Sequence, residues 1–121
     1  MSRLTLVALW LTLCGFTGTA SYYTEASCKK EGTSGIMANG RRLDDEAFTA
    51  ASWGYKFGTT LKVCRADRAI SQPCVQVNVT DRGPAKHLYR QGRILDLSRA
   101  AFLRLAPLSQ GIVQVSAEVL P

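Results

Sequence analysis

Two neighbouring segments of the chain, residues 60–65 and 74–80, alternate apolar and polar residues. A period of two is typical of a β-strand that has one face in the core. Cys64 and Cys74 both fall on the polar, outward face of this pattern, and residues 65–73 join the segments as a candidate hairpin. The shared parity permits a cross-strand disulfide, worth about 2–4 kcal/mol in an oxidising compartment. We therefore predict a hairpin that a Cys64–Cys74 disulfide holds together.

Further alternating segments make the predicted fold mainly β. In residues 112–120, three valines and an alanine share one face, and polar residues share the other. The remaining strand candidates are residues 16–24 and 93–96. A chain of 121 residues has room for one domain. Short strands with short helices between them favour a closed barrel over a sandwich.

One or two short helices are expected beside the strands. Ser98 is a suitable N-cap for a helix over residues 99–106, which Pro107 would end. Residues 44–48 fit a further helical turn.

Few aromatic residues are available for the core or for a binding surface. Trp53 and Phe57 are expected in the core. Tyr22 and Tyr23 are adjacent, so on a strand one of the two must face outward, where it could stack on a sugar ring.

The N-terminal residues have the order of a secretory signal. Arg3 precedes an apolar run over residues 4–13, and small and polar residues follow. The run is too short to span a bilayer, which takes about 20 residues. We predict a signal over residues 1–15 and a folded domain over residues 16–121. Lipid modification of Cys14, plain secretion and retention of the segment remain open.

The export context bears on the other cysteines and on metal binding. Cys28 is left over from the predicted disulfide, either as a thiol or joined to Cys14. The chain has a single histidine, His87, so no zinc site is expected, and no cofactor motif is present. The net charge of +6 favours anionic partners such as nucleic acid, anionic lipid or an acidic wall polymer, without deciding among them.

Two carboxylates stand at predicted strand ends. Asp81 precedes Arg-Gly-Pro, and Asp96 ends the apolar run "RIL". An aspartate in this position is commonly a cap that accepts hydrogen bonds from loop N–H groups. The alternative is an active site, and the pattern alone leaves both open.

Five sequence blocks carry a specific resemblance. The blocks "GTASYY", "MANGRRLDDEAFTAAS", "KFGTTLKV", "VNVTDRGP" and "GRILDLSRAAFLRL" resemble, in this order, the rare lipoprotein A family. The resemblance extends from Gly18 nearly to the C-terminus. It implies a small double-psi β-barrel, a fold shared with expansins, and endolytic lytic transglycosylase activity on peptidoglycan glycan strands. It also implies an exported protein of the bacterial cell envelope, for which we expect a monomer that binds no nucleic acid.

The same resemblance assigns roles to residues. Asp81 in "DRGP" matches the family's candidate catalytic aspartate, and Asp96 in "LDLS" matches an acidic position beside the substrate groove. Further residues expected to bind substrate are Asn39, Arg41, Tyr22 and Ser98. Two positions depart from the family: Arg41 stands where a glutamate is common after "ANG", and Ser52 where a histidine is common after "TAA".

These departures leave alternatives open. Asp81 could sustain catalysis alone while Arg41 binds a muramic acid carboxylate, or the domain could bind peptidoglycan without cutting it, as expansins loosen walls. A third class, a secreted barrel that inhibits a protease or binds nucleic acid, rests on the basic charge alone.

Overall fold

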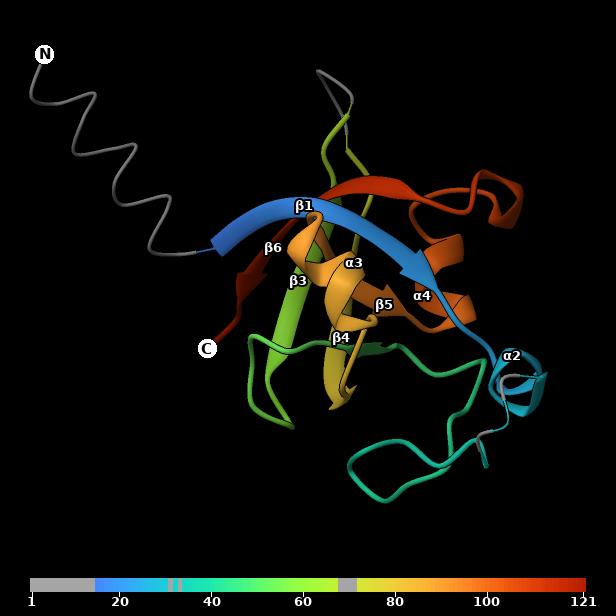
Figure 1. Cartoon of the computed structure of the whole chain (residues 1–121). Helices are drawn as coiled ribbons and strands as arrows, with labels where there is room; N and C mark the ends of the chain where they lie inside the picture. Colours follow the sequence, from blue (N-terminus) through green and yellow to red (C-terminus); the bar gives the residue numbers. More distant parts are fainter. Residues whose placement is uncertain (1–14, 31, 33, 68–71) are drawn as a thin grey trace, which may run out of the picture.

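The chain folds into one closed barrel of six strands, seen in a computed structural model that describes residues 15–30, 32, 34–67 and 72–121 (Figure 1). The strands are β1 (Gly15–Tyr22), β2 (Thr49–Ala51), β3 (Thr60–Arg65), β4 (Cys74–Asp81), β5 (Arg93–Leu97) and β6 (Val113–Val119). The helices are α2 (Glu25–Lys30), α3 (Lys86–Arg90), α4 (Arg99–Leu103) and the 3-10 turn η1 (Leu108–Gln110). The mainly β closed barrel predicted from the sequence is confirmed.

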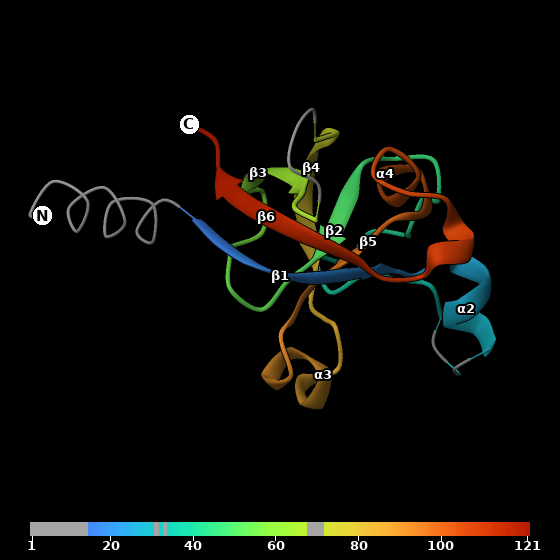
Figure 2. The same cartoon turned by 90° about the horizontal axis from the view of Figure 1, so that it is seen from above.

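Strands that are distant in the sequence lie next to one another in the barrel. The order around it is β1-β5-β2-β4-β3-β6. β1 runs parallel to β5, and β2 parallel to β4, whereas the other neighbouring pairs are antiparallel. Viewed from above, α3 projects from one side of the barrel and α2 lies beyond the end of β1 (Figure 2). Residues from several different strands therefore lie on the surface between α2 and α3.

The core is filled by the inward positions of the alternating strands. β4 alternates exposed and buried residues along most of its length, with its valines inside. The inward apolar residues of β3 and β6 face them and are at most 6% exposed, whereas Val119 at the end of β6 is 49% exposed. The predicted parity of residues 60–65 and 74–80 is therefore confirmed.

Helix α4 closes one end of the core. The hydroxyl of Ser98 accepts the N–H of Ala101, which is the predicted N-cap, and it donates to the carbonyl of Ala47. The cap fixes the start of the helix, and Phe102 then points into the barrel with no exposed surface. The ring of Phe102 packs against Tyr22, with 4.9 Å between centroids. Phe102 in the core therefore contacts the last residue of β1 directly.

Several elements differ from the sequence-based expectation. The pattern did not predict β2, whose three residues are too few to show a period, and it did not predict α2 or α3. Residues 44–48, expected as a further helical turn, contain a single hydrogen-bonded turn, in which Ala47 N–H donates to the carbonyl of Asp44. Helix α4 ends at Leu103, earlier than predicted.

Trp53 and Phe57 were expected in the core, and this prediction is wrong. Their side chains are 39% and 42% exposed. Both follow β2 in a loop that leaves the barrel wall, so neither can reach the interior. The core is filled instead by aliphatic side chains and Phe102.

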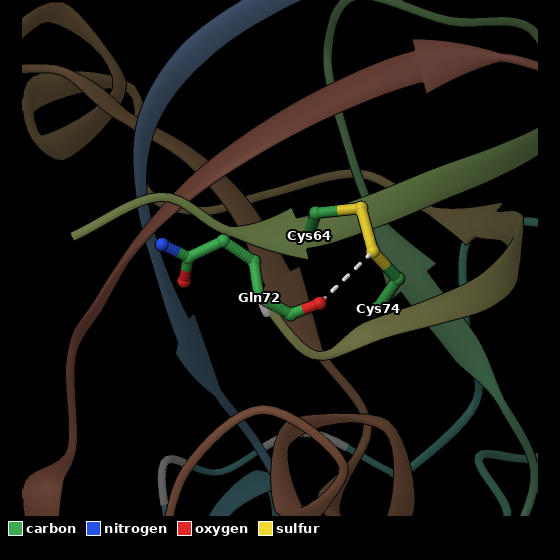
Figure 3. Close-up of a disulfide and its surroundings, with 3 residues drawn as sticks. All are labelled: Cys64, Gln72 and Cys74. Carbon is green, nitrogen blue, oxygen red and sulfur yellow. Dashed lines mark hydrogen bonds between the residues drawn. A yellow bond between two sulfur atoms is a disulfide. The ribbon is translucent and has the colours of Figure 1, made fainter. Parts of the chain in front are cut away.

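Cys64 and Cys74 form the predicted disulfide (Figure 3). They are directly opposite each other on β3 and β4, with 4.0 Å between their Cα atoms. The sulfur of Cys74 also lies 3.7 Å from the carbonyl oxygen of Gln72. The link closes the end of the hairpin from which residues 65–73 emerge.

Reduction of this disulfide is expected to lower the free energy of unfolding by about 2–3 kcal/mol, because the link spans a sequence separation of ten residues and restricts the unfolded chain. Urea denaturation with and without reductant measures the effect. The double variant Cys64→Ser/Cys74→Ser is the control, since its midpoint should no longer respond to reductant. Equal midpoints for oxidised and reduced wild type would contradict the prediction.

The predicted signal, residues 1–15, lies outside the described residues except for Gly15, as does Cys14, so both remain predictions. Within the described ranges, no helix has the length and apolar character needed to cross a membrane.

Candidate functional site

Three polar side chains and one alanine lie in a row across four strands of the barrel wall. Ala51 of β2 is paired with Asp81 on one side and with Asp96 on the other. Asp96 is in turn paired with Ser21 of β1. The two aspartates are therefore two strand spacings apart, about 10 Å between backbones. The two carboxylates that the sequence singled out do belong to one site.

Irregular pairing helps to place these residues. The register between β2 and β4 skips Thr80, so that Ala50 is opposite Val79 but Ala51 is opposite Asp81. The register between β1 and β5 likewise skips Ile94. An extra residue in one strand shifts the alternation beyond it and re-aims the following side chain. Asp81 and Asp96 both follow such a skip and both face a surface groove.

The groove has a volume of about 560 Å³ and lies between α2 and α3. Residues from β1, β2, β4, β5, α2 and α3 and from the loops between these elements line it. Its lining is Ser21, Tyr22, Tyr23, Ser27, Cys28, Ile36, Ala51, Trp53, Asp81, Arg82, Gly83, Pro84, Ala85, Leu88, Arg93 and Asp96. A groove lined by a mixture of apolar and convergent polar groups is the usual form of a ligand site.

Asp81 accepts three hydrogen bonds. Its Oδ1 accepts the backbone N–H of Ala38 at 2.7 Å and that of Arg82 at 2.8 Å. Its Oδ2 accepts the hydroxyl of Tyr23 at 2.8 Å. A carboxylate offers about four acceptor positions. Among the described residues, one position on Oδ2 is left for a proton or a substrate atom.

Asp96 is held by a hydrogen bond from the neighbouring strand β1. Its Oδ1 accepts the hydroxyl of Ser21. The loop after Asp81 reaches toward it, because a Cβ atom added to Gly83 would lie 3.9 Å from Oδ2 of Asp96 and 3.3 Å from the Cβ of Ala51. Glycine at position 83 therefore lets the Asp81 loop pack closely over β2.

Tyr23 is the partly buried partner of the catalytic candidate. Burial raises the pKa of its phenol far above the ordinary value, and the charges of Asp81 and Asp96 and the hydrogen bond to Asp81 raise it further. The phenol therefore stays protonated and remains a hydrogen-bond donor to Asp81. The sequence showed only that one of two adjacent tyrosines must face outward, and it did not single out Tyr23.

Tyr23→Phe is expected to reduce the loss of stability at alkaline pH. Above pH about 10 the unfolded chain releases the phenol proton but the folded chain keeps it, so this group lowers the free energy of unfolding as pH rises. The contribution is about 1 kcal/mol per pH unit in that range. Urea denaturation across alkaline pH measures it for both proteins, whose lysines and other tyrosines titrate alike. Parallel curves would contradict the prediction.

The side chain of Arg82, the residue after Asp81, binds the loop after β2. Its Nη1 donates to the carbonyls of Ser52 and Tyr55 at 2.7 and 2.8 Å. Its guanidinium carbon lies 3.9 Å from the ring centroid of Phe57. Arg82 therefore fixes the loop after β2 and covers Phe57.

Trp53 stands on this loop at the wall of the groove. Its Nε1 donates to the carbonyl of Pro84 at 2.6 Å, which holds the indole in place, and Lys86 Nζ lies 5.1 Å from its ring centroid. The indole is therefore a fixed, partly exposed apolar surface within the site, and the sequence had assigned it to the core.

The other residues expected to bind substrate are distributed unevenly. Tyr22 lines the groove, whereas Arg41, Asn39 and Ser98 are not among its lining residues. Arg41 is exposed on the loop before β2. Asn39 Oδ1 accepts the N–H of Arg41 and so shapes that loop. Ser98 is buried and used as the α4 cap, so the structure gives it a structural role.

Ser52, at the position where the resembling family commonly has a histidine, is also withdrawn from the groove. Its side chain is fully buried, and its hydroxyl oxygen accepts the N–H of Gly54. In the part of the chain that the structure describes, no three His, Cys, Asp or Glu side chains gather closely enough to hold a metal ion.

Structural comparison identifies the barrel type. A papain inhibitor from Streptomyces aligns with a TM-score of 0.62 and 24% identity, over 88% of this chain and 94% of that one. An expansin from Clavibacter michiganensis aligns with a TM-score of 0.58 and 22% identity, over 88% of this chain and 50% of that one. At these identities the likeness concerns the fold alone, and it confirms the double-psi β-barrel.

Sequence comparison identifies the family. A probable endolytic peptidoglycan transglycosylase RlpA from Nostoc sp. is 36% identical over 106 residues, which are 87% of this chain and 26% of the relative. An endolytic peptidoglycan transglycosylase RlpA from Rickettsia prowazekii is 34% identical over 87% of this chain and 30% of the relative. The chain thus spans about a quarter to a third of these relatives. The lytic transglycolase family model matches residues 15–117, and the chain therefore belongs to this family.

Proposed function

We propose that this chain is an endolytic peptidoglycan lytic transglycosylase, which cuts glycan strands and leaves 1,6-anhydromuramic acid ends. The observation that carries the proposal is the row of Asp81, Ala51 and Asp96, which places two carboxylates along one groove. Membership of the lytic transglycolase family and the names of the relatives support the reaction type.

The chemistry needs a single proton carrier. In glycoside hydrolysis one carboxyl group protonates the leaving oxygen and a second acts as nucleophile or activates water. In a lytic transglycosylase the 6-hydroxyl of muramic acid attacks its own anomeric carbon, so the C1–O6 bond forms as the glycosidic C1–O4 bond breaks. Asp81 gives its proton to O4 and afterwards takes the proton of the 6-hydroxyl.

The hydrogen bonds of Asp81 determine which oxygen reacts. Oδ1 is occupied by two backbone N–H groups, and these can only donate. Oδ2 has Tyr23 on one side and its second position available. We therefore assign the transferred proton to Oδ2. Tyr23, which stays protonated, holds this oxygen in a fixed orientation.

The remaining groove residues fit the binding of a glycan strand. Asp96, held by Ser21, lies two strands away from Asp81 and is assigned to sugar hydroxyls. Tyr22 and Trp53 expose aromatic surface in the same groove, which suits the apolar faces of sugar rings. The disulfide and the predicted signal support an exported protein of the bacterial cell envelope, in which Cys14 is the candidate site of a lipid anchor.

A second candidate is a barrel that binds peptidoglycan without cutting it. The observations that favour it are Arg41 and Ser52, because neither supplies a second proton carrier to the groove. The expansin relatives of the fold, one solved in complex with cellohexaose, supply a precedent for glycan binding. Asp81 with its available Oδ2 position favours the enzyme.

Mass spectrometry of purified peptidoglycan after incubation with the protein separates the two candidates. We expect soluble fragments that end in 1,6-anhydromuramic acid. Sedimentation of the protein with insoluble peptidoglycan, without any such ends, would refute the proposed activity and leave the binding barrel.

A further inference from the structure

The groove contains two arginines with different environments. Arg82 donates to the carbonyls of Ser52 and Tyr55 and is covered by the ring of Phe57. Arg93, at the start of β5, has a buried Nε that finds no acceptor among the described residues. A buried polar group without a partner is rare in folded proteins and calls for an explanation.

The skip at Ile94 explains why Arg93 lines the groove together with Asp96. Residues three apart on a regular strand point to opposite faces. Because the β1–β5 register skips one residue between them, Arg93 and Asp96 are displaced by an effective two positions. Arg93 therefore stands about 7 Å along the strand from the carboxylate row. This separation places it beside the reaction site but away from Asp81.

From this placement we propose that Arg93 forms a carboxylate subsite, which binds a carboxylate carried by the glycan strand. The inference rests on the proposed function and specifies its substrate. The two terminal nitrogens of a guanidinium present parallel N–H donors that match the two oxygens of a carboxylate, and in Arg93 they belong to a side chain that lines the groove. On peptidoglycan such a group is either the lactyl carboxylate of muramic acid without a stem peptide or a carboxylate of the stem peptide. The subsite replaces Arg41 in this role, since Arg41 lies on the exposed loop outside the groove lining.

Binding to three kinds of soluble glycan strand tests the subsite. The first carries free lactyl carboxylates after removal of the stem peptides, the second is the same material with its carboxylates reduced to alcohols, and the third retains the stem peptides. If the lactyl carboxylate is the ligand, we expect the wild-type protein to bind the reduced strands about 10- to 100-fold more weakly than the unreduced strands. If a stem-peptide carboxylate is the ligand, we expect the reduced strands to bind more weakly than the peptide-bearing strands by the same factor. Equal binding of all three by the wild type overturns the proposal.

Variants show whether the preference for carboxylate-bearing strands depends on Arg93. Arg93→Gln should bind carboxylate-bearing and reduced strands alike, and Arg93→Lys should recover only part of the preference, because an ammonium lacks the paired donors. Arg90→Gln is the matched control, since it removes the same charge from the exposed end of α3, outside the groove lining. Arg93→Gln that keeps the wild-type preference overturns the proposal. The comparison of strands with wild type decides the question even if Arg93→Gln does not fold.

The outcome is separable from that of the proposed function. Anhydro ends formed by a protein that binds reduced strands as well as unreduced ones would refute the subsite and keep the activity. A preference for carboxylates that depends on Arg93, without anhydro ends, would keep the subsite and refute the activity.

Discussion

Asp81→Asn is expected to lower the rate of formation of anhydromuramic ends by about 10²–10⁴-fold, the usual contribution of one general acid–base group. The barrel should remain folded. The amide oxygen can still accept the N–H groups of Ala38 and Arg82, and the amide nitrogen can donate to Tyr23, whose hydroxyl turns around. An amide cannot deliver a proton at the position of Oδ2. Mass spectrometry of the products measures the loss, and circular dichroism verifies the fold.

Glu118→Gln provides the control for this substitution, because it makes the same change on the exposed face of β6. It should leave product formation unchanged. Asp96→Asn should cost less than Asp81→Asn if Asp96 only binds substrate, and a larger cost would mean that the two roles are reversed. If Asp81→Asn unfolds the domain, its hydrogen bonds to the loop are its main contribution, and the assignment as proton carrier loses its support.

Phe102→Ala is expected to lower the free energy of unfolding by about 3–5 kcal/mol. Phe102 is the largest of the fully buried side chains, and its removal leaves a cavity at the end of the barrel that α4 closes. It also removes the ring against which Tyr22 packs, so the groove end of β1 should loosen and product formation should fall. Urea denaturation measures the change in stability.

Leu103→Ala is the matched control for Phe102→Ala. It truncates the next residue of the same helix, whose side chain is 45% exposed, and should cost less than about 0.5 kcal/mol. Similar losses for the two variants would show that α4 contributes through its helical structure and not through the packing of Phe102.

Much of the barrel follows from local sequence pattern. The alternation in residues 60–65 and 74–80 predicted β3, β4 and the disulfide, because a period of two determines which side chains share a face and the cysteines share the outward one. Ser98 likewise predicted the start of α4, since capping depends on the adjacent backbone alone. Trp53 was misassigned because its large apolar ring favours burial on average, whereas its actual environment depends on the loop after β2.

The assembly of the site depended on contacts between distant parts of the chain. Sequence pattern and family resemblance singled out Asp81 and Asp96, but the order β1-β5-β2-β4 and the short strand β2 between them decided that they share a groove. The skips at Thr80 and Ile94 change the alternation of β4 and β5, and register between strands is not visible within one strand. Tyr23, Arg82 and Arg93 acquired different roles for the same reason. The sequence by itself determined five of the six strands, the disulfide and, together with the family resemblance, the candidate acids, because these depend on local pattern. Only the tertiary structure decided which oxygen of Asp81 is available and which arginine has a buried Nε without an acceptor among the described residues, because both depend on hydrogen bonds across the barrel.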